Sequence, residues 1–465
     1  MGYVKQEKHP LEYEYLQPEH LKGFDSYKYN CVDNSPLSVY VSHPFWNWLV
    51  VVSFQILEIK NSYQKFYPRT WVPNVLTLVG WGFVMAGFFI EAYLDYSIDR
   101  NSDGSTNPIP DWFWFAAAAC TFLGHTLDGT DGKQSRRIGA SGPTGELSNF
   151  QNEQYPKNIS KPIQIKKNIC SSVKNHKKIP VDHGLDSWST VPFTITIFSI
   201  FGRGRFSISS VELLCVLIST QIVFFTTHWE KYNTGIMFLS WAYDVSQFGL
   251  VIVYLWTYIV GYQWFHFDVL GGIVNFAFTF EIGFYMCCLM SLIASAYNVH
   301  KAEKLKQPTI LAGIRPAWPV VILFGSSIYW AVHSPTNVID ADPRFFFFCM
   351  GTVFSNITCR LIIAQMASTV CDIYNLTLGI YLSTIAPEVG GRAGSAIHGW
   401  FIYKIFDMKH PLSFYNPSNE LPILRVSTLV ITALHLHYGI CVVRQLCRHF
   451  KIYAFDVSYL QNRSK

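Results

Sequence analysis

The chain has 465 residues, of which 50% are hydrophobic, 16% are aromatic and only 14% are charged. Because a soluble domain usually carries about 25% charged residues, this composition excludes an ordinary soluble fold and indicates a membrane protein. The formal net charge of +5 is modest and does not indicate a nucleic-acid partner.

The first predicted segment, residues 1–70, is polar and aromatic. Within it, "HPFWNWLVVV" (43–52) is too short to span a bilayer. Its Trp and Phe side chains suit a helix that lies in the interface on the cytoplasmic face. We therefore expect residues 1–70 to be a cytoplasmic and interfacial segment.

Long apolar runs follow, each suited to a transmembrane helix. They cover residues 75–94, 112–127, 187–201, 208–227, 246–264, 270–297, 317–333, 345–369 and 420–443, with a weaker run at 371–386. The predicted fold is therefore all-α: a polytopic helical membrane protein of about ten transmembrane helices. We expect this transmembrane domain to cover 71–445 and a cytoplasmic tail to cover 446–465.

Basic residues assign the two sides of the membrane. Clusters of basic residues recur at alternate ends of successive runs, which places them on the same side of the membrane. The positive-inside rule makes that side cytoplasmic. Arg203 and Arg205 are a local exception on the other side. Between the fourth and fifth runs, "THWEKYNTG" (227–235) is expected to be a loop that anchors the chain at the interface or contacts a charged headgroup.

Two short stretches carry four carboxylates. In "LDGTDGKQSRR" (127–137), Asp128 and Asp131 are three residues apart and share one helix face. In "VDHGLDSW" (181–188), Asp182 and Asp186 are four apart at the start of the third run. Four neighbouring anions repel one another unless cations lie among them. Without histidine or cysteine clusters, oxygen ligands favour Mg²⁺ or Mn²⁺, and two ions are expected.

Glycines and cations accompany the carboxylates. Gly129, Gly132 and Gly145 lack side chains, so that a phosphorylated ligand can approach the backbone. Lys133 and Arg136 supply donors for phosphate oxygens. The combination predicts a pyrophosphate site for metal-assisted phosphoryl transfer. The alternative is a set of loop charges beside membrane helices, but glycine-spaced carboxylates favour the site.

"DGTDGKQSR" (128–136), Gly145 eight residues later and "DHGLD" (182–186) resemble the CDP-alcohol phosphotransferase signature, D-x2-D-G-x2-A-R-x8-11-G-x3-D-x3-D. Ser135 stands where the family usually has Ala. Segments such as "PNVLTLVG" (73–80) and "HWEKYNTGIMFL" (228–239) resemble the eukaryotic ethanolaminephosphotransferase 1 branch, and the resemblance covers most of the chain.

The resemblance implies the CDP-alcohol phosphotransferase fold in an endoplasmic reticulum or Golgi membrane, often as a homodimer. It also implies that a diacylglycerol hydroxyl attacks the β-phosphate of CDP-ethanolamine and gives phosphatidylethanolamine and CMP. The active site would face the cytoplasm, where a lipid and a water-soluble nucleotide can meet. A choline or dual-specificity enzyme and a non-catalytic relative are the alternatives.

The resemblance also assigns roles to residues. Asp128, Asp131, Asp182 and Asp186 would bind metal, Lys133 and Arg136 would hold phosphates, and Asn74, Gly129, Gly132 and Gly145 would border the nucleotide. The base that accepts the glycerol proton would be Asp186 or the pair Glu146 and His183. Because a metal-bound carboxylate is a weak base and histidine titrates nearer neutrality, we favour His183.

One feature departs from the family pattern. The family has three residues between Gly145 and the third aspartate, whereas this chain has 36, Glu146 to Val181. Removing 148–180, which is rich in Lys, Asn and Ile, restores the spacing. Two hypotheses remain: translated intron sequence, which the composition favours, and a lineage-specific loop that yields an inactive or regulated form.

Overall fold

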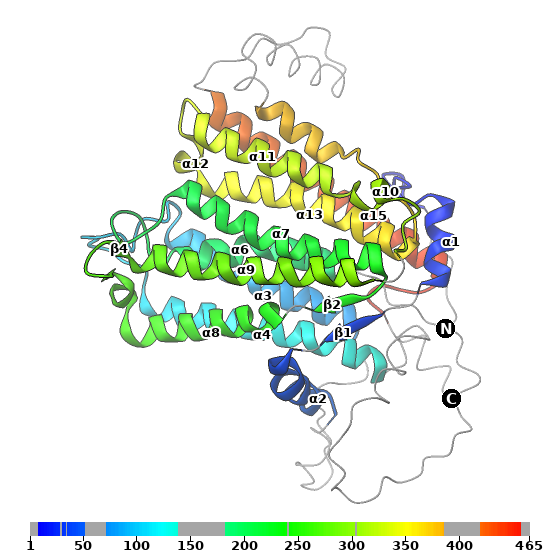
Figure 1. Ribbon diagram of the computed structural model, residues 1–465, viewed down its shortest axis with the longest axis horizontal. Helices are drawn as coiled ribbons and strands as arrows, with labels where there is room; N and C mark the ends of the chain where they lie inside the picture. The colour runs from blue at the N-terminus through cyan, green and yellow to red at the C-terminus, as the bar shows by residue number, and fades with distance from the viewer. Residues whose placement is uncertain are drawn as a thin grey trace, which may run out of the picture.

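The computed structural model describes residues 8–27, 30–33, 35–51, 71–137, 182–239, 241–302, 305–385 and 419–456. Within these ranges the chain is a bundle of helices with two short strand pairs (Figure 1). Strand β1 (Cys31–Asp33) pairs in parallel with β2 (Met237–Leu239), and β3 (Asp268–Val269) pairs antiparallel with β4 (Val274–Asn275). The prediction of an all-α fold is confirmed.

Every predicted apolar run coincides with a helix. The helices are α3 (Pro73–Leu94), α4 (Asp111–Arg137), α6 (Asp182–Phe198), α7 (Ser210–Thr234), α8 (Trp241–Val260), α9 (Phe276–Lys301), α11 (Ala317–His333), α13 (Pro343–Ala367), the short helix Leu376–Ile385 and α15 (Glu420–Phe450). Among the described residues, six of these are long and apolar enough to cross a membrane: α3, α7, α8, α9, α13 and α15.

Smaller helices complete the described chain. They are α1 (Pro18–Ser26), the π-helical turn Ser38–Ser42, α2 (His43–Val51), the 3₁₀ turn Tyr262–Phe265, α10 (Ile310–Ile314) and α12 (Val338–Ala341). The helix α2 covers the stretch expected to lie in the membrane interface, and it packs against α4.

The helix α13 is the centre of the bundle. In its most apolar window 78% of the residues are buried, and it packs against α6, α7, α11 and α15. A second group consists of α3, α4 and α8 (Figure 1). The helix α6 joins the groups because it packs against both α3 and α13. The helix α6 is therefore held from two sides.

The prediction of a loop at 227–235 is wrong, because these residues are mostly the last turns of α7. The helix begins with a capping box between Ser209 and Glu212 and ends at Gly235, whose φ of 83° is the left-handed conformation that glycine adopts most readily. The polar residues of this stretch have partners inside the bundle: Asn298 Nδ2 donates to Glu230 Oε1 at 2.8 Å. The polar composition of 227–235 predicted a loop, but hydrogen bonds between its polar side chains and other helices allow it to be helical.

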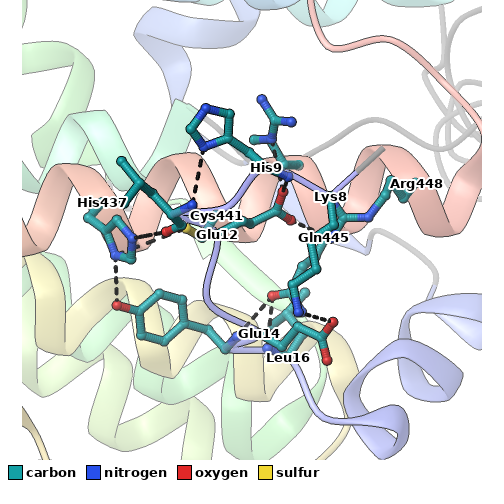
Figure 2. A network of polar contacts seen from close by, with 12 residues as sticks. Lys8, His9, Glu12, Glu14, Leu16, His437, Cys441, Gln445 and Arg448 are labelled. Carbon is teal, nitrogen blue, oxygen red and sulfur yellow. Dashed lines mark hydrogen bonds and ion pairs between the residues drawn. The ribbon is translucent and has the colours of Figure 1, made fainter. Parts of the chain in front are cut away.

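The N-terminal segment is fastened to α15 by an ion-pair cluster (Figure 2). The buried carboxylate of Glu12 lies 3.1 Å from Arg444 Nε and contacts Arg448 as well. The hydrogen bond from Arg448 is the main reason that the pKa of Glu12 is lowered below its ordinary value. The contact is therefore complete near neutral pH.

Uncharged hydrogen bonds extend this attachment (Figure 2). Gln445 Oε1 accepts from the backbone N–H groups of Tyr15 and Leu16 at 3.0 and 3.1 Å. His437 lies 3.0 Å from the Tyr15 hydroxyl and 2.9 Å from the Leu11 carbonyl. A segment more than 400 residues away in sequence thus becomes part of the bundle at this end.

The opposite end of the bundle is closed by buried ion pairs. Arg344 donates two hydrogen bonds to Glu91, at 2.6 and 2.7 Å, and its Nε donates to the Tyr96 carbonyl at 2.7 Å. Asp342 accepts from the Tyr96 hydroxyl at 3.0 Å and from Arg425 Nε at 2.8 Å. These contacts join α3, α13 and α15 and leave each of the two acids with an arginine partner.

Candidate functional site

The two motif helices come together through α3. The helix α4 carries Asp128 and Asp131 in its last turns, α6 begins with Asp182, and both helices pack against α3. The first turns of α3 carry Asn74 and Thr77. The two helices that the sequence predicted to carry the carboxylates thus share α3 as a neighbour.

Asp131 is held by α3. It is buried, and the hydroxyl of Thr77 donates a hydrogen bond to its Oδ2. This contact depends on close packing of the two helices, because a Cβ atom added to Gly80 would lie only 3.0 Å from the Gly124 carbonyl oxygen. Small residues at such a crossing let two backbones approach each other. The glycines thus bring Thr77 within reach of the motif.

The oxygen ligands present fit a hard divalent ion. Asp128 is partly buried one helical turn from Asp131, and Asp186 is about one quarter exposed on α6. Carboxylate oxygens are the ligands that Mg²⁺ and Mn²⁺ prefer. Among the described side chains no three acidic, histidine or cysteine groups form a metal-binding set. The side chain of Asp182, the fourth predicted ligand, lies outside the described part.

His183 lies beside Asp186, one turn along α6. Its Nδ1 is 3.7 Å from Asp186 Oδ2, and both side chains are about one quarter exposed. The ring of His228 on α7 packs edge-on against that of His183, with centroids 5.2 Å apart. His228 itself is buried. The imidazole therefore has a carboxylate on one side and a second, inner imidazole on another.

Polar groups of α13 and α15 support this part of α6. The hydroxyl of Ser355 donates to the Gly184 carbonyl at 3.3 Å and lies 2.7 Å from that of Ser187. His435 lies 3.2 Å from both Ser355 and Asn356. His435 and His437, two residues apart on α15, thus have separate partners. The network fixes the turn between His183 and Asp186.

The predicted phosphate-binding residues are described only in part. Lys133 is buried in the last turns of α4, and Gly132 is partly buried beside it. Arg136 belongs to the final turn of α4, but its side chain lies outside the description. Gly145 and Glu146 also lie outside the described residues. Their roles stay predictions.

Two predicted nucleotide-binding residues have protein neighbours. Asn74 is buried, and its Nδ2 donates to the Ala454 carbonyl at 2.9 Å, so the segment after α15 reaches the start of α3. Gly129 faces the indole ring of Trp46 on α2. Both contacts come from the ends of the chain rather than from the bundle itself.

Sequence reasoning did not identify three residues that contact the site: Thr77, His228 and Trp46. Only His228 has a local signal, because it continues an apolar run, and an ionisable residue inside such a run is often functional. The other two matter through contacts between helices, and no local pattern reveals those.

The chain resembles curated proteins over nearly its whole length, although no family model matches it. It is 34% identical over 448 residues to "Ethanolaminephosphotransferase 1" of Mus musculus, covering 96% of this chain and 95% of that protein. It is also 34% identical over 449 residues to the Homo sapiens protein of that name, with the same coverage. A Dictyostelium discoideum protein, "Uncharacterized CDP-alcohol phosphatidyltransferase class-I family protein 1", is 26% identical over 442 residues, which are 93% of this chain and 92% of that one.

Proposed function

The chain belongs to the CDP-alcohol phosphatidyltransferase family, and from this premise we propose that it is an ethanolaminephosphotransferase. It transfers phosphoethanolamine from CDP-ethanolamine to diacylglycerol and releases phosphatidylethanolamine and CMP. The proposal is supported by the packing of α4 and α6, the two helices that bear the motif aspartates, against α3 and by the hydrogen bond from Thr77 of α3 to Asp131. A lipid and a nucleotide can both reach the ends of these helices.

The reaction exchanges one P–O bond for another. The diacylglycerol oxygen bonds to the β-phosphorus, the bond from that phosphorus to the bridging oxygen breaks, and CMP leaves. The hydroxyl proton must pass to a base. His183 is our candidate, because its imidazole is partly exposed and faces Asp186, which can stabilise the imidazolium formed. Asp186 itself, or Glu146 acting with His183, is the alternative base.

A divalent metal requirement is general in this family. Asp128, Asp131, Asp182 and Asp186 would hold Mg²⁺ or Mn²⁺, and we propose two ions. When bound, such ions neutralise charge on the phosphates. Thr77 would keep the carboxylate of Asp131 oriented toward the site. Lys133 and Arg136 would bind phosphate oxygens, and Gly132 and Gly145 would leave room for them.

Asn74 is proposed to border the nucleotide and to be shielded by the segment at Ala454 until a substrate binds. We also propose that this end of the bundle faces the cytoplasm of an endoplasmic reticulum or Golgi membrane. In its favour, Lys301, Arg444, Arg448 and Lys451 are at the ends of helices that finish here. A homodimer is the proposed assembly, which cross-linking in membranes would test.

The test is CMP release in membranes that lack their own transferases. CDP-ethanolamine or CDP-choline is supplied with diacylglycerol, and the full chain is compared with a chain lacking 148–180. Ethanolamine-dependent CMP release by either chain supports the proposal. Activity of the shortened chain alone would make 148–180 an inactivating insertion. A clear preference for CDP-choline would establish the choline alternative, and two folded but silent chains would leave the non-catalytic relative.

A further inference from the structure

Trp46 and Gly129 fit each other closely. Trp46 lies on α2 and is buried, and its ring rests on the backbone of Gly129 in α4. A Cβ atom added to Gly129 would lie 2.6 Å from Trp46 Cδ2 and closer still to Cε2 and Cζ2. Since real Cβ atoms do not approach other atoms so closely, any larger residue at 129 would displace the ring or the helix.

The indole ring has little freedom to move aside. Its centroid is 5.6 Å from the ring of His43 and 5.3 Å from that of His125, and both pairs are edge-on. His125 is buried and lies 3.5 Å from Asp244 Oδ1 on α8. Asp244 in turn accepts a hydrogen bond from Ser38, just before α2. The ring is therefore held by α2, α4 and α8 together.

The contact lies beside the motif. Gly129 follows Asp128 directly and precedes Asp131 by two residues. Since successive helical residues differ by about 100° around the axis, Gly129 points well away from Asp131, which faces α3. The turn that carries both aspartates is thus pressed by α3 on one side and by Trp46 on the other.

We propose that Trp46 is a positioning residue for the phosphotransfer site and that Gly129 is required because only a residue without a side chain leaves room for the indole ring. This inference rests on the proposed function. It differs from the sequence interpretation, in which Gly129 leaves room for the nucleotide. In the new assignment the N-terminal helix α2 sets where the turn carrying Asp128 and Asp131 lies relative to α6.

A suppressor experiment separates the two roles. Gly129→Ala should lower kcat at least about tenfold, because the motif turn or the ring must shift. Trp46→Leu alone should cost less. If the indole is the obstacle, the double variant Gly129→Ala/Trp46→Leu should return to the activity of Trp46→Leu, with an unchanged KM for CDP-ethanolamine. Gly82→Ala on α3 is the matched control, since an added Cβ there meets nothing within 4 Å.

Two outcomes would overturn the inference. One is a double variant whose loss equals the product of the two single losses. The other is a raised KM for CDP-ethanolamine in both Gly129→Ala and the double variant, as expected if the nucleotide needs the space. The unfolding midpoints of the three single variants and the double variant measure the same steric clash independently of activity. If the wild type releases no CMP but the double variant recovers the unfolding midpoint lost in Gly129→Ala, the proposed function is overturned and only the packing contact remains.

Discussion

The ion pairs of Glu91 and Asp342 at one end of the bundle differ from the contacts of the motif aspartates at the other. At the end with β3 and β4, Glu91 and Asp342 are each bound to an arginine, at distances of 2.6–2.8 Å. At the motif end, the contacts described for Asp131 and Asp186 are with a threonine hydroxyl and a histidine ring. Arginine neutralises Glu91 and Asp342, whereas we propose that the motif carboxylates bind a divalent cation.

This difference suggests that one group of acids contributes to the stability of the fold and the other to the reaction. An acid with a permanent arginine partner contributes to the fold, and removing the partner leaves an uncompensated buried charge. A carboxylate that serves as a metal ligand, as proposed for the motif aspartates, can be exchanged at smaller cost to the fold but at large cost to a reaction that needs its charge. Substitutions at the two ends should therefore have distinct signatures.

The largest expected effect is at the motif end. Asp131→Asn should lower the rate of CMP release at least about a hundredfold, because the variant loses the negative charge that we propose binds the metal ion. Its unfolding midpoint in detergent should stay close to that of the wild type. Asp340→Asn, which alters an ion pair with Arg203 at the other end, serves as the control and should stay active. Comparable activity of the two variants would contradict the assignment of the reaction to the motif end and of stability to the other end.

At the opposite end the expected loss is one of stability. Arg344→Met should destabilise the protein by about 3–5 kcal/mol, since Glu91 would be left buried without its partner. Glu91→Gln combined with Arg344→Met should recover part of this loss, and chemical denaturation in detergent would measure both. Equal losses for the single and double variants would mean that the buried charge of Glu91 is not the cause.

A smaller effect is expected where α3 crosses α4. Gly80→Ala should cost about 1–3 kcal/mol, because the new methyl group presses on the Gly124 carbonyl. It should also lower activity by separating Thr77 from Asp131. Gly82→Ala, two residues away and facing open space, should do neither. Thermal unfolding and CMP release distinguish the two, and identical behaviour would show that the crossing tolerates the methyl group.

The smallest effect concerns pH and the N-terminal segment. The pKa of Glu12 is lowered by Arg448, so its contribution to stability is complete above the ordinary glutamate pKa. It is lost as the pH falls through the lowered pKa of the folded state. Limited proteolysis should therefore cut residues 8–17 faster at pH 4 than at pH 7, and Glu12→Gln should abolish most of that difference. A cleavage rate independent of pH in the wild type would exclude this attachment.

Hydropathy gave the helices correctly, because a bilayer demands about 20 apolar residues for each crossing and such runs are visible locally. It failed at 227–235, where polar side chains such as Glu230 have partners inside the bundle. Polar composition alone cannot distinguish internal pairing from exposure to solvent. The ends of α8 and α9 also differ from the predicted runs by a few residues.

The site was predictable only in part. The spacing of Asp128 and Asp131 predicted one helix face, and α4 has them there. Thr77, Trp46 and His228 reach the motif from helices that are distant in sequence, and local patterns carry no signal for Thr77 and Trp46. Residues 138–181 lie outside the described structure, and the roles of Gly145 and Glu146 stay predictions.

One comparison tests the central claim most directly. Metal-dependent CMP release from CDP-ethanolamine and diacylglycerol would be measured for Asp186→Asn and for Glu91→Gln/Arg344→Met, each normalised to folded protein. The account predicts that Asp186→Asn loses at least about a hundredfold in activity and that the double variant keeps activity within a few-fold of the wild type. An active Asp186→Asn enzyme, or a folded double variant that is silent, would contradict the assignment of chemistry to the motif end.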